Sequence, residues 1–400
     1  MEKKNQIPKY PLLRFPEFTD EWKEVKLGEV LSFEVGYPFS SDAFNEEGNG
    51  VRLIKNRDLK ADDRVVFYGG EYDAQYIVQN GDILIGMDGD FSPCLWKKGK
   101  ALLNQRVGRV NANQNTSRVF ILYVLVDSLK KIEHKTSSTT VKHLSHKDVE
   151  KIKASLPSLA EQKKIAALLS LIDERIEVQN AIIKEQEALK ASLIRRLFDR
   201  TLRFPEFTDE WKEVKLGEVG EYVRGLTYNA DDVQDMGTIV IRANNLNDGC
   251  PIDFKTELVH VSILPDPHQI LRNTDITICM ANGSSHLVGK ASYCCDTSLG
   301  TITVGAFCGI FRSTNDLARW IFQTPTYKRY IYKAIQGGNG AIANLKSDDI
   351  LNQSYFLPSL AEQRKIAALL SAVDERIAVE KEYATLLQKQ KAYLLRQMFV

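Results

Sequence analysis

The chain has 400 residues, and its 53 Lys and Arg balance 52 Asp and Glu to a formal net charge of +1. This length allows two to three domains, and the near-neutral charge means that any case for nucleic-acid binding must rest on local clusters. The sequence contains no run of about 18 apolar residues, which excludes a transmembrane helix.

The N-terminus and the cysteines favour a cytoplasmic protein. The first residues, MEKKNQ, have no apolar segment behind them, so we expect no signal peptide. The six cysteines contain no C-x-x-C pair, which gives little support to a zinc site. We therefore expect reduced thiols, no metal and a cytoplasmic location.

A segment near the N-terminus occurs twice. Residues 13–30 read LRFPEFTDEWKEVKLGEV and return letter for letter as residues 202–219. Its aromatic residues supply bulk for packing, and the alternation after Trp22 predicts a first strand. We interpret this block as a packing module that joins a domain to a connecting helix, rather than as a binding site.

Two divergent blocks, residues 31–155 and 220–356, follow the two copies of this segment. Short β-rich runs broken by Gly, Asn and Asp turns predict a sheet-dominated domain in each block. Each block also has one helix-like segment, at residues 119–132 and 317–323. The blocks share two landmarks, LIKNRDL at 53–59 with VIRANNL at 240–246, and GDILIGM at 81–87 with TDITICM at 274–280.

A second repeat closes each block. Residues 156–176 read LPSLAEQKKIAALLSLIDERI, and residues 357–377 repeat them with three changes. Pro157 and Ser158 predict a helix start, and Glu161 would complete a capping box with Ser158.

Both copies continue as long helices. Apolar residues recur at alternating steps of four and three, which predicts a coiled-coil seam. No Gly or Pro interrupts residues 158–198 or 359–400, so each helix would be about 60 Å long. Gln179, Gln186 and Lys190 occupy positions where apolar residues are expected. Two such helices in one chain could cover each other's seams.

These features predict an α+β fold with an internal pseudo-twofold repeat. We expect two sheet-rich domains separated by two long antiparallel coiled-coil helices. The expected boundaries are 1–155 and 201–356 for the domains, and 156–200 and 357–400 for the helices.

The sequence contains no motif that supports catalysis. It lacks the G-x-x-x-x-G-K-[ST], G-x-G-x-x-G, G-x-S-x-G and H-E-x-x-H patterns, and also an Asn-Pro-Pro or Asp-Pro-Pro tetrapeptide. We therefore expect a non-catalytic protein.

Basic segments before each long helix are candidates for phosphate binding. Residues 130–147 hold five lysines and three histidines against one Glu, and the second block combines Arg319 with residues 327–333 and 336–340. Lys and Arg neutralise phosphates, and small residues let backbone N–H groups approach them. The alternative is a solvated charged face beside a loop. The candidates are Lys135, Thr136, Ser137, Ser138, Lys142, Lys328, Arg329, Lys333 and Asn339.

Other polar residues could reach base edges. Asn or Gln can pair with adenine and Arg with guanine in the major groove. The alternative is a set of turn residues and surface amides. The candidates in the first block are Tyr37, Ser40, Asn56, Arg57, Asp88, Asn104, Gln105 and Arg106. Those in the second block are Arg224, Tyr228, Arg242, Asn244, Asn245, Asn282 and Ser284.

The repeated motifs resemble a known family. Two divergent blocks, each closed by L-P-S-L-A-E-Q-[KR]-K-I-A-A-L-L-S-x-x-D-E-R-I and a long helix, resemble the specificity (S) subunit of a Type I restriction–modification system. NQRVGRV at 104–110 and GDIL at 81–84 are similar to that family too, and the resemblance covers nearly the whole chain. The second block departs from it, because TITVG at 301–305 stands where the first block has NQRVG.

The resemblance implies a function. Each block would be a target recognition domain that reads one half of a split, non-palindromic site in double-stranded DNA, and the paired helices would fix the gap between the halves. The chain itself would be non-catalytic and would carry no cofactor. Two methylase subunits would methylate adenine N6 with S-adenosylmethionine, and restriction subunits would use ATP and Mg to translocate and cleave DNA. Glu174, Arg175, Glu375 and Arg376 are candidates for methylase docking, or else ordinary solvated charges.

Two hypotheses from other classes stay open at this point. A duplicated scaffold that binds only protein partners fits the near-neutral charge, since a DNA reader is often basic. A self-contained nuclease is disfavoured by the missing metal and nucleotide motifs.

Overall fold

A computed structural model of the chain describes residues 10–135, 143–336 and 343–400. Among these residues, no helix is long and apolar enough to cross a membrane, and no group of three or more His, Cys, Asp or Glu could hold a metal ion. All six cysteines are free thiols.

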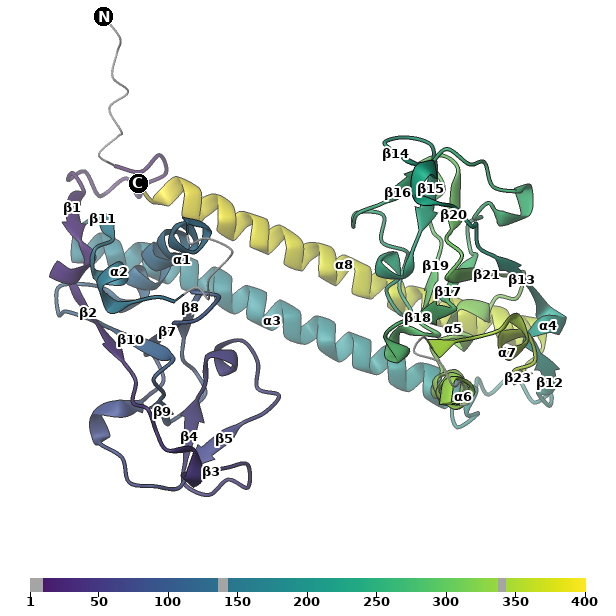
Figure 1. Cartoon of the computed structure of the whole chain (residues 1–400), viewed down its shortest axis with the longest axis horizontal. Helices are drawn as coiled ribbons and strands as arrows, with labels where there is room; N and C mark the ends of the chain where they lie inside the picture. Colours follow the sequence, from purple (N-terminus) through teal and green to yellow (C-terminus); the bar gives the residue numbers. More distant parts are fainter. Residues whose placement is uncertain (1–9, 136–142, 337–342) are drawn as a thin grey trace, which may run out of the picture. The chain divides into compact units, whose positions relative to one another are not determined.

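The chain divides into two compact units (Figure 1). Unit 1 comprises residues 1–179 and 383–400, and unit 2 comprises residues 180–382. The division falls inside the long helices α3 (Leu159–Phe198) and α8 (Leu360–Met398), so each unit contains one sheet-rich domain and part of both helices. The expected boundaries, which keep each helix as a separate segment, stay a prediction.

The described residues of unit 1 form three sheets. Its strands are β1 (Lys23–Lys26), β2 (Leu31–Val35), β3 (Phe44–Asn45), β4 (Val51–Ile54), β5 (Val66–Tyr68), β6 (Ile77–Val78), β7 (Ile83–Gly86), β8 (Pro93–Leu95), β9 (Ala101–Leu103), β10 (Val107–Ala112) and β11 (Lys153–Leu156). Its short helices are α1 (Arg118–Lys135) and α2 (His146–Glu150). One sheet has the order β2-β10-β7-β8, another has the order β3-β5-β4-β9-β6, and β1 pairs with β11.

The four-stranded sheet of unit 1 lies between the helices and the five-stranded sheet (Figure 1). Successive residues of a strand point to opposite faces. Accordingly, Ile83 and Ile85 pack with Phe120 of α1, whereas Leu84 packs with Trp96 on the other face. A continuous apolar run is therefore needed on β7, and this is why GDILIGM is apolar at its centre.

Unit 2 repeats this arrangement. Its strands are β12 (Lys212–Lys215), β13 (Gly220–Arg224), β14 (Val233–Gln234), β15 (Thr238–Ile241), β16 (Val259–Val261), β17 (Ile276–Cys279), β18 (Ala281–Asn282), β19 (Ala291–Tyr293), β20 (Ile302–Val304), β21 (Cys308–Ser313), β22 (Ala343–Asn344) and β23 (Ser354–Leu357). Its short helices are α4 (Leu216–Val219), α5 (Ala318–Ile321), α6 (Pro325–Gln336) and α7 (Ser347–Leu351). The sheets have the orders β13-β21-β17-β19, β14-β16-β15-β20, β12-β23 and β18-β22.

The two units therefore share one core topology, to which unit 1 adds the edge strand β6, and the expected α+β fold with an internal repeat is confirmed. The parallel pair β4–β9 of unit 1 corresponds to the parallel pair β15–β20 of unit 2. Glycines lie at the same close approach in both units. A Cβ on Gly36 would lie 2.3 Å from the Asn104 carbonyl oxygen, and one on Gly225 would lie 2.2 Å from the Gly305 carbonyl oxygen. Only glycine fits either position without moving backbone.

The first repeat and the LPSLAEQ motif form the junction between each domain and its long helix. In unit 1 the buried Glu161 carboxylate accepts two hydrogen bonds of 2.8 Å from Arg14. Trp22 donates to the same carboxylate at 3.3 Å. In unit 2 Glu362 accepts equivalent bonds of 2.9 and 2.8 Å from Arg203. The expected packing role of residues 13–30 is confirmed, as is the strand after Trp22, since β1 pairs with β11.

The helix starts differ from the expectation in one detail. The Ser158 hydroxyl accepts a 3.4 Å bond from the Glu161 amide, as an N-cap should. The Glu161 side chain, however, binds Arg14 and does not complete the expected capping box. Its carboxylate is used to attach residues 13–30 to the helix.

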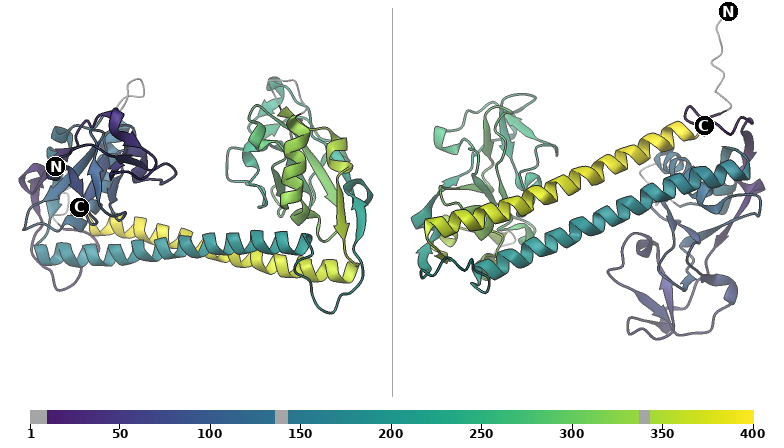
Figure 2. Two further views of the ribbon diagram at one scale, coloured as in Figure 1. Left: turned by 90° about the horizontal axis from the view of Figure 1, so that it is seen from below. Right: turned by 180° about the vertical axis from the view of Figure 1, so that it is seen from behind.

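In each unit α3 and α8 run antiparallel (Figure 2). The expected seam residues Leu169 and Leu370 are fully buried. Lys190, which interrupts the apolar pattern, lies 2.7 Å from Asp374 of the other helix in unit 2. The repeat places the equivalent pair, Lys391 and Asp173, at 2.5 Å in unit 1. A charged residue in a seam is tolerated when it is paired, and such pairs can specify helix register.

A backbone position that the two units share differs in strain. The residue two positions before β7 and β17 has positive φ, 93° at Gly81 and 76° at Thr274. Each amide donates to an equivalent carbonyl, Trp96 at 2.8 Å and Cys294 at 2.9 Å. Glycine adopts this conformation freely, whereas a β-branched residue is strained there.

We therefore expect Thr274→Gly to raise the free energy of unfolding of unit 2 by about 0.5–1 kcal/mol, because relief of left-handed strain exceeds the entropic cost of glycine. Thermal unfolding of the variant would measure the change. Thr274→Ala keeps a Cβ and should give little gain, and Gly81→Thr should destabilise unit 1. A Thr274→Gly variant less stable than the parent would contradict the strain argument.

Candidate nucleic-acid interface

Unit 1 brings several of the expected residues together around Asp88, and we call Asn56, Asp88, Arg106 and His143 the unit 1 cluster. The Arg106 guanidinium lies 3.1 Å from the Asp88 carboxylate, and His143 Nδ1 lies 2.9 Å from it. The Asn56 amide donates to the Asp88 carbonyl at 2.6 Å. The chain segments after β4, β7 and β9 and before α2 therefore meet at one place.

The loop that carries Arg106 is held by backbone bonds. Tyr37 forms a parallel bridge with Asn104, and the Met87 amide donates to the Arg106 carbonyl at 3.0 Å. The side chains of Gln105 and Arg106 are left exposed, whereas Asn104 is partly buried. Tyr37 is 47% exposed, and its ring packs 5.2 Å from that of Phe39. An exposed amide, guanidinium and phenol on a fixed backbone can hydrogen-bond base edges or phosphates.

Acidic groups beside this loop restrict what it can bind. Asp88 partly neutralises Arg106. Hydrogen bonds from Lys60 and Ser92 lower the pKa of Asp90 to about 2, so Asp90 is ionised at neutral pH. Because Asp88 pairs with Arg106 and Asp90 pairs with Lys60, little positive charge is left for a phosphate. The site is compatible with a base edge, because a carboxylate can also accept a bond from a cytosine amino group.

The other candidates of unit 1 lie apart from the cluster or outside the described residues. The Ser40 hydroxyl donates to Asp42 at 3.3 Å, and Arg57 donates to the Arg64 carbonyl at 3.2 Å. Both are local contacts of surface loops. The remaining expected phosphate ligands lie outside the described residues: Thr136, Ser137, Ser138 and Lys142, together with the side chain of Lys135.

Unit 2 gathers its candidates around a cavity of about 740 Å³, which we call the unit 2 pocket. The pocket is lined by Tyr228, Arg242, Asn244, Asn282 and Phe307 together with small and apolar residues. The Nε of Arg242 is buried without a hydrogen-bond partner among the described residues. An arginine left without an acceptor beside an open cavity is available to a ligand.

Asn245 was expected at the surface and is instead buried, which corrects that candidate. Its carbonyl oxygen accepts a 3.0 Å bond from the Arg242 amide, and its amide donates at 3.4 Å to the carbonyls of Asp253 and Glu257. Asp58 makes the same bond to the Lys55 amide in unit 1. Asn245 therefore holds its own loop and has no side-chain atom free for DNA. The spacing of three between a polar side chain and the amide it caps is the signal that could have identified this role.

Other candidates of unit 2 make local contacts. The Asn282 side chain accepts a 2.9 Å bond from the Ser284 amide, so this pair forms a turn at the edge of the pocket. The carbonyl of Arg224 accepts a 3.0 Å bond from Gln269, while the Arg224 side chain is exposed.

The expected correspondence between NQRVG at 104–108 and TITVG at 301–305 also needs correction. Leu226 forms a parallel bridge with Gly305, as Tyr37 does with Asn104. The Met280 amide donates to the Phe307 carbonyl at 2.8 Å, as Met87 does to Arg106. Residues 305–307 therefore take the place of residues 104–106, and TITVG at 301–305 belongs mostly to β20. Strand pairing makes Gly305 the equivalent of Asn104. The sequence comparison had instead aligned Asn104 with Thr301, four residues earlier.

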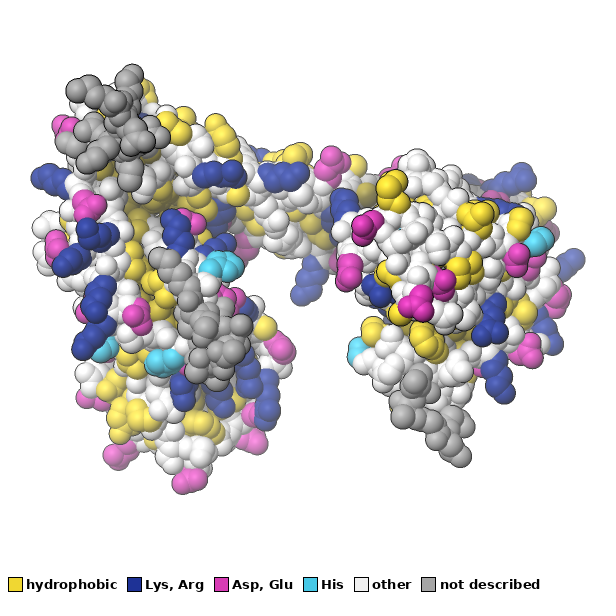
Figure 3. Space-filling view, turned by 45° about the horizontal axis from the view of Figure 1, so that its top comes forward, with side chains coloured by type: hydrophobic (Ala, Val, Ile, Leu, Met, Phe, Trp, Pro, Cys, Tyr) yellow, Lys and Arg dark blue, Asp and Glu magenta, His cyan; other side chains and the backbone are white. Residues whose placement is uncertain are grey.

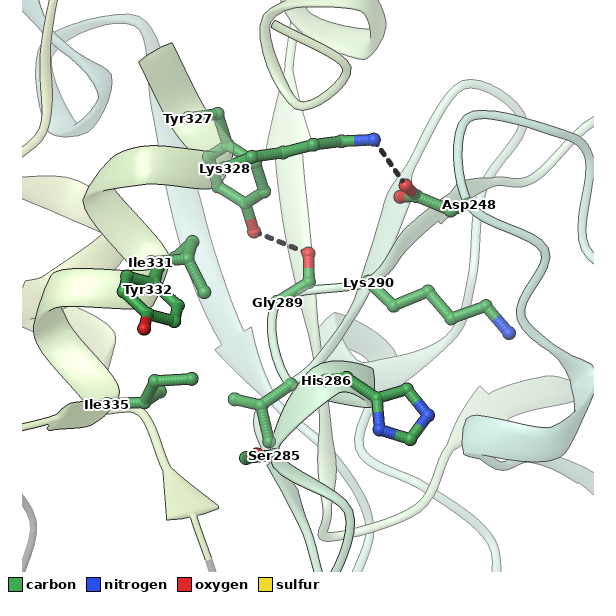
Figure 4. Close-up of a pocket in the computed structure, with 11 residues that line it drawn as sticks. Asp248, Ser285, His286, Gly289, Lys290, Tyr327, Lys328, Ile331, Tyr332 and Ile335 are labelled. Atoms are coloured by element: carbon green, nitrogen blue, oxygen red, sulfur yellow. Dashed lines mark hydrogen bonds and ion pairs between the residues drawn. The ribbon is translucent and has the colours of Figure 1, made fainter. Parts of the chain in front are cut away.

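The basic run of the second block forms helix α6, which was not expected as a helix. Figure 4 shows Tyr327 pointing inward, where its buried hydroxyl donates to the Gly289 carbonyl at 2.8 Å. Lys328 points to Asp248 and forms a 3.0 Å ion pair. Arg329 and Lys333 are exposed on the same helix, and Asn339 lies outside the described residues.

Arg319, expected in this basic cluster, has another partner. It lies on α5, and its guanidinium bonds Asp374 of α8 at 2.6 Å while stacking on Trp320 and Tyr293. It is therefore part of the contact between the domain and the long helix.

The surface charge is mixed. On the face drawn in Figure 3, Lys and Arg side chains alternate with Asp and Glu and do not gather into one patch. The docking candidates Glu174, Arg175, Glu375 and Arg376 are all exposed on the long helices. Arg175 also contacts the Tyr383 hydroxyl, and Arg376 pairs with Glu380 at 3.0 Å.

Two residues of these sites were not among the single candidates. His143 was considered only as part of the basic run at residues 130–147, and the structure places it against Asp88. Phe307 could not be predicted, because the sequence does not distinguish an exposed phenylalanine from a buried one. Only the strand register shows that Phe307 is the equivalent of Arg106 in unit 2.

Comparison with known proteins agrees with this architecture. The family model for the Type I restriction modification DNA specificity domain matches residues 19–188 and 208–389. The chain is 28% identical over 383 residues to the Type I restriction enzyme EcoBI specificity subunit of Escherichia coli, covering 87% of this chain and 78% of that protein. It is 23% identical over 421 residues to the MjaVIII specificity subunit of Methanocaldococcus jannaschii, covering 96% and 92%.

The fold is also similar to a solved one. The crystal structure of the S subunit of a Type-I restriction-modification system from M. genitalium matches with a TM-score of 0.61 at 16% identity, covering 98% of this chain and 99% of that chain. Each half of the family match contains one sheet-rich domain followed by one long helix. The chain therefore belongs to the Type I restriction modification DNA specificity family and is a specificity subunit, not a catalytic one.

Proposed function

We propose that this chain reads a split, asymmetric DNA site, with unit 1 recognising one half and unit 2 the other. One observation carries the proposal: two units of one topology present different side chains at equivalent loop positions, Arg106 in unit 1 and Phe307 in unit 2. Two copies of one reader would select a palindrome, whereas two readers of different chemistry select an asymmetric site.

The long helices would fix the gap between the half-sites. Helices α3 and α8 each continue from one unit into the other without a break. A continuous helix transmits position far better than a flexible linker. The number of base pairs between the half-sites would then be a property of these helices.

The chemistry would belong to partner subunits. Methylase subunits would transfer a methyl group from S-adenosylmethionine to adenine N6, and restriction subunits would use ATP and Mg to translocate and cleave DNA. The exposed Glu174, Arg175, Glu375 and Arg376 would contact the methylase. We place the complex in the cytoplasm, where it has access to DNA.

The experiment that tests the proposal is a genome-wide map of adenine methylation in cells with this chain and its methylase, and in cells that lack only this chain. A split, asymmetric motif that requires the chain supports the proposal and gives both half-sites and the gap. Identical maps from cells with demonstrably active methylase would reject it.

Arg106→Ala should relax or weaken recognition of one half-site and leave the other unchanged, because Arg106 belongs to unit 1 and the equivalent residue of unit 2 is Phe307. The loss of one side-chain contact to a base edge corresponds to about 1–3 kcal/mol of discrimination. The methylation map of the variant measures both halves at once. Arg64→Ala, which removes an exposed arginine of unit 1 that pairs with Glu46, is the matched control. Equal loss at both half-sites would contradict the two-reader arrangement.

The net charge is near zero and the surface charge is mixed. Both observations also fit an alternative function, a duplicated scaffold that binds only proteins. Affinity of the methylase complex for DNA at several salt concentrations separates the two. A steep fall of affinity with salt indicates phosphate contacts and rejects the scaffold.

A further inference from the structure

Phe307 is an exposed aromatic residue of unit 2, and its role as a DNA contact rests on the proposed function. Among the described phenylalanines it is the most exposed, at 67%. Exposed aromatic side chains on a functional surface are typical of contact residues, since their burial against a partner gains free energy. The backbone bond from Met280 holds Phe307 in the place that Arg106 has in unit 1.

The residues around Phe307 also differ from those around Arg106. In unit 1, Asp88 bridges to His143, and the Arg106 charge is paired with Asp88. In unit 2 the equivalent bridge joins Ala281 to Asn344. The paired charges of unit 1 are thus replaced by an apolar pair, Phe307 and Ala281, and both line the unit 2 pocket.

The other residues that line the pocket are partly apolar and partly polar. Leu226, Ala306 and Cys308 add further uncharged surface. Burial raises the pKa of the Cys308 thiol, so this group stays neutral. Arg242, Asn244 and Asn282 supply donors and acceptors beside it. A thymine offers this combination in the major groove, with an apolar C5-methyl group next to the O4 acceptor.

We propose that Phe307 is a specificity-determining residue that recognises a thymine by contact with its C5-methyl group, in the half-site read by unit 2. Unit 1 then uses Arg106 and hydrogen bonds at the same loop position, while unit 2 uses an apolar contact. The two half-sites are then recognised by different kinds of contact, hydrogen bonds in one and an apolar contact in the other.

The test uses the complete complex with its methylase and duplexes that carry the mapped motif. Each thymine of the unit 2 half-site is replaced singly by deoxyuridine, which removes the C5-methyl group and keeps the hydrogen-bonding edge. At one position the parent complex should lose affinity about three- to five-fold, the value of one buried methyl group. Phe307→Ala should bind the thymine and deoxyuridine duplexes equally, and Phe307→Leu should keep part of the preference.

Phe356→Ala is the matched control, because Phe356 is also exposed, at 42%, but lies on β23 outside the pocket. It should keep the full preference for thymine. Recognition of the unit 1 half-site reports whether each variant is folded.

Three outcomes would overturn the inference while leaving the proposed function intact. They are a unit 2 half-site without thymine on either strand, no deoxyuridine effect at any position, and a Phe307→Ala variant that keeps the thymine preference. If Phe307→Ala lowered affinity equally for every duplex, Phe307 would act as a stacking wedge instead. Failure of the proposed function looks different, because no sequence-specific methylation would depend on the chain at all.

Discussion

Glu161→Ala is expected to lower the free energy of unfolding of unit 1 by about 3 kcal/mol. Glu161 is 1% exposed and is the shared acceptor of Arg14 and Trp22. Its removal leaves a guanidinium of which 13% is exposed without its carboxylate, and an indole N–H without its acceptor. It also detaches residues 13–30 from α3, so the junction loses its main polar contact.

Hydrogen exchange measured separately on peptides of the two units would locate this loss. Glu161→Gln keeps an acceptor for both donors and should cost much less. Glu362→Ala is the matched variant in unit 2 and should transfer the loss of protection to that unit. Equal loss of protection in both units after Glu161→Ala would show that the junction does not act locally.

The second large effect is expected from Asp374→Ala, which should cost unit 2 about 3–5 kcal/mol. Its carboxylate is 14% exposed and pairs with Lys190 at 2.7 Å and Arg319 at 2.6 Å. Without it, two cations remain close together in a poorly hydrated place. Arg319 cannot move away easily, because it is stacked between Trp320 and Tyr293.

The equivalent variant in unit 1, Asp173→Ala, should cost less, about 1–3 kcal/mol. Asp173 is 34% exposed, and its second donor is the neutral hydroxyl of Tyr123 at 2.8 Å. Burial raises the pKa of Tyr123, so this hydroxyl stays protonated and leaves no charge behind. Hydrogen exchange of both variants measures the difference, and an Asp173→Ala loss as large as that of Asp374→Ala would contradict it.

The parts of the fold that the sequence predicts are those with a periodic signal. The spacing of Leu169 and Leu370 predicts the seam, and each is buried in a core that contains residues of its domain and of the other long helix. The pairing of Lys190 with Asp374 was not predictable, because an isolated lysine in a seam does not indicate which residue of another helix faces it. Helix α6 was missed although Thr324, whose hydroxyl accepts from the Tyr327 amide, precedes Pro325 in a recognisable helix start. Its basic and aromatic composition was interpreted as a ligand-binding run instead.

The candidate sites were predicted less well, for a physical reason. Loop residues such as Asn244 and Asn245 are adjacent and chemically identical, yet one lines a pocket and the other is buried beneath its own loop. Which of them faces outward depends on backbone direction, and single-sequence patterns carry little information on it. The Arg106 and Phe307 correspondence needed the strand register, because the segments between the landmarks differ in length.

The core of unit 1 contains residues from both ends of the described chain. Phe399 stacks on Phe120 with ring centroids 5.2 Å apart and meets Trp22 edge-on at 6.4 Å. A ribosome adding about 5–20 residues per second needs about 20–75 s to go from Trp22 to Phe399. The core cluster of unit 2 that contains Phe311 and Trp320, in contrast, takes its described residues from between 193 and 370. The unit whose synthesis starts second can therefore complete its core first, because the core of unit 1 also needs Phe399, which is synthesised after that core.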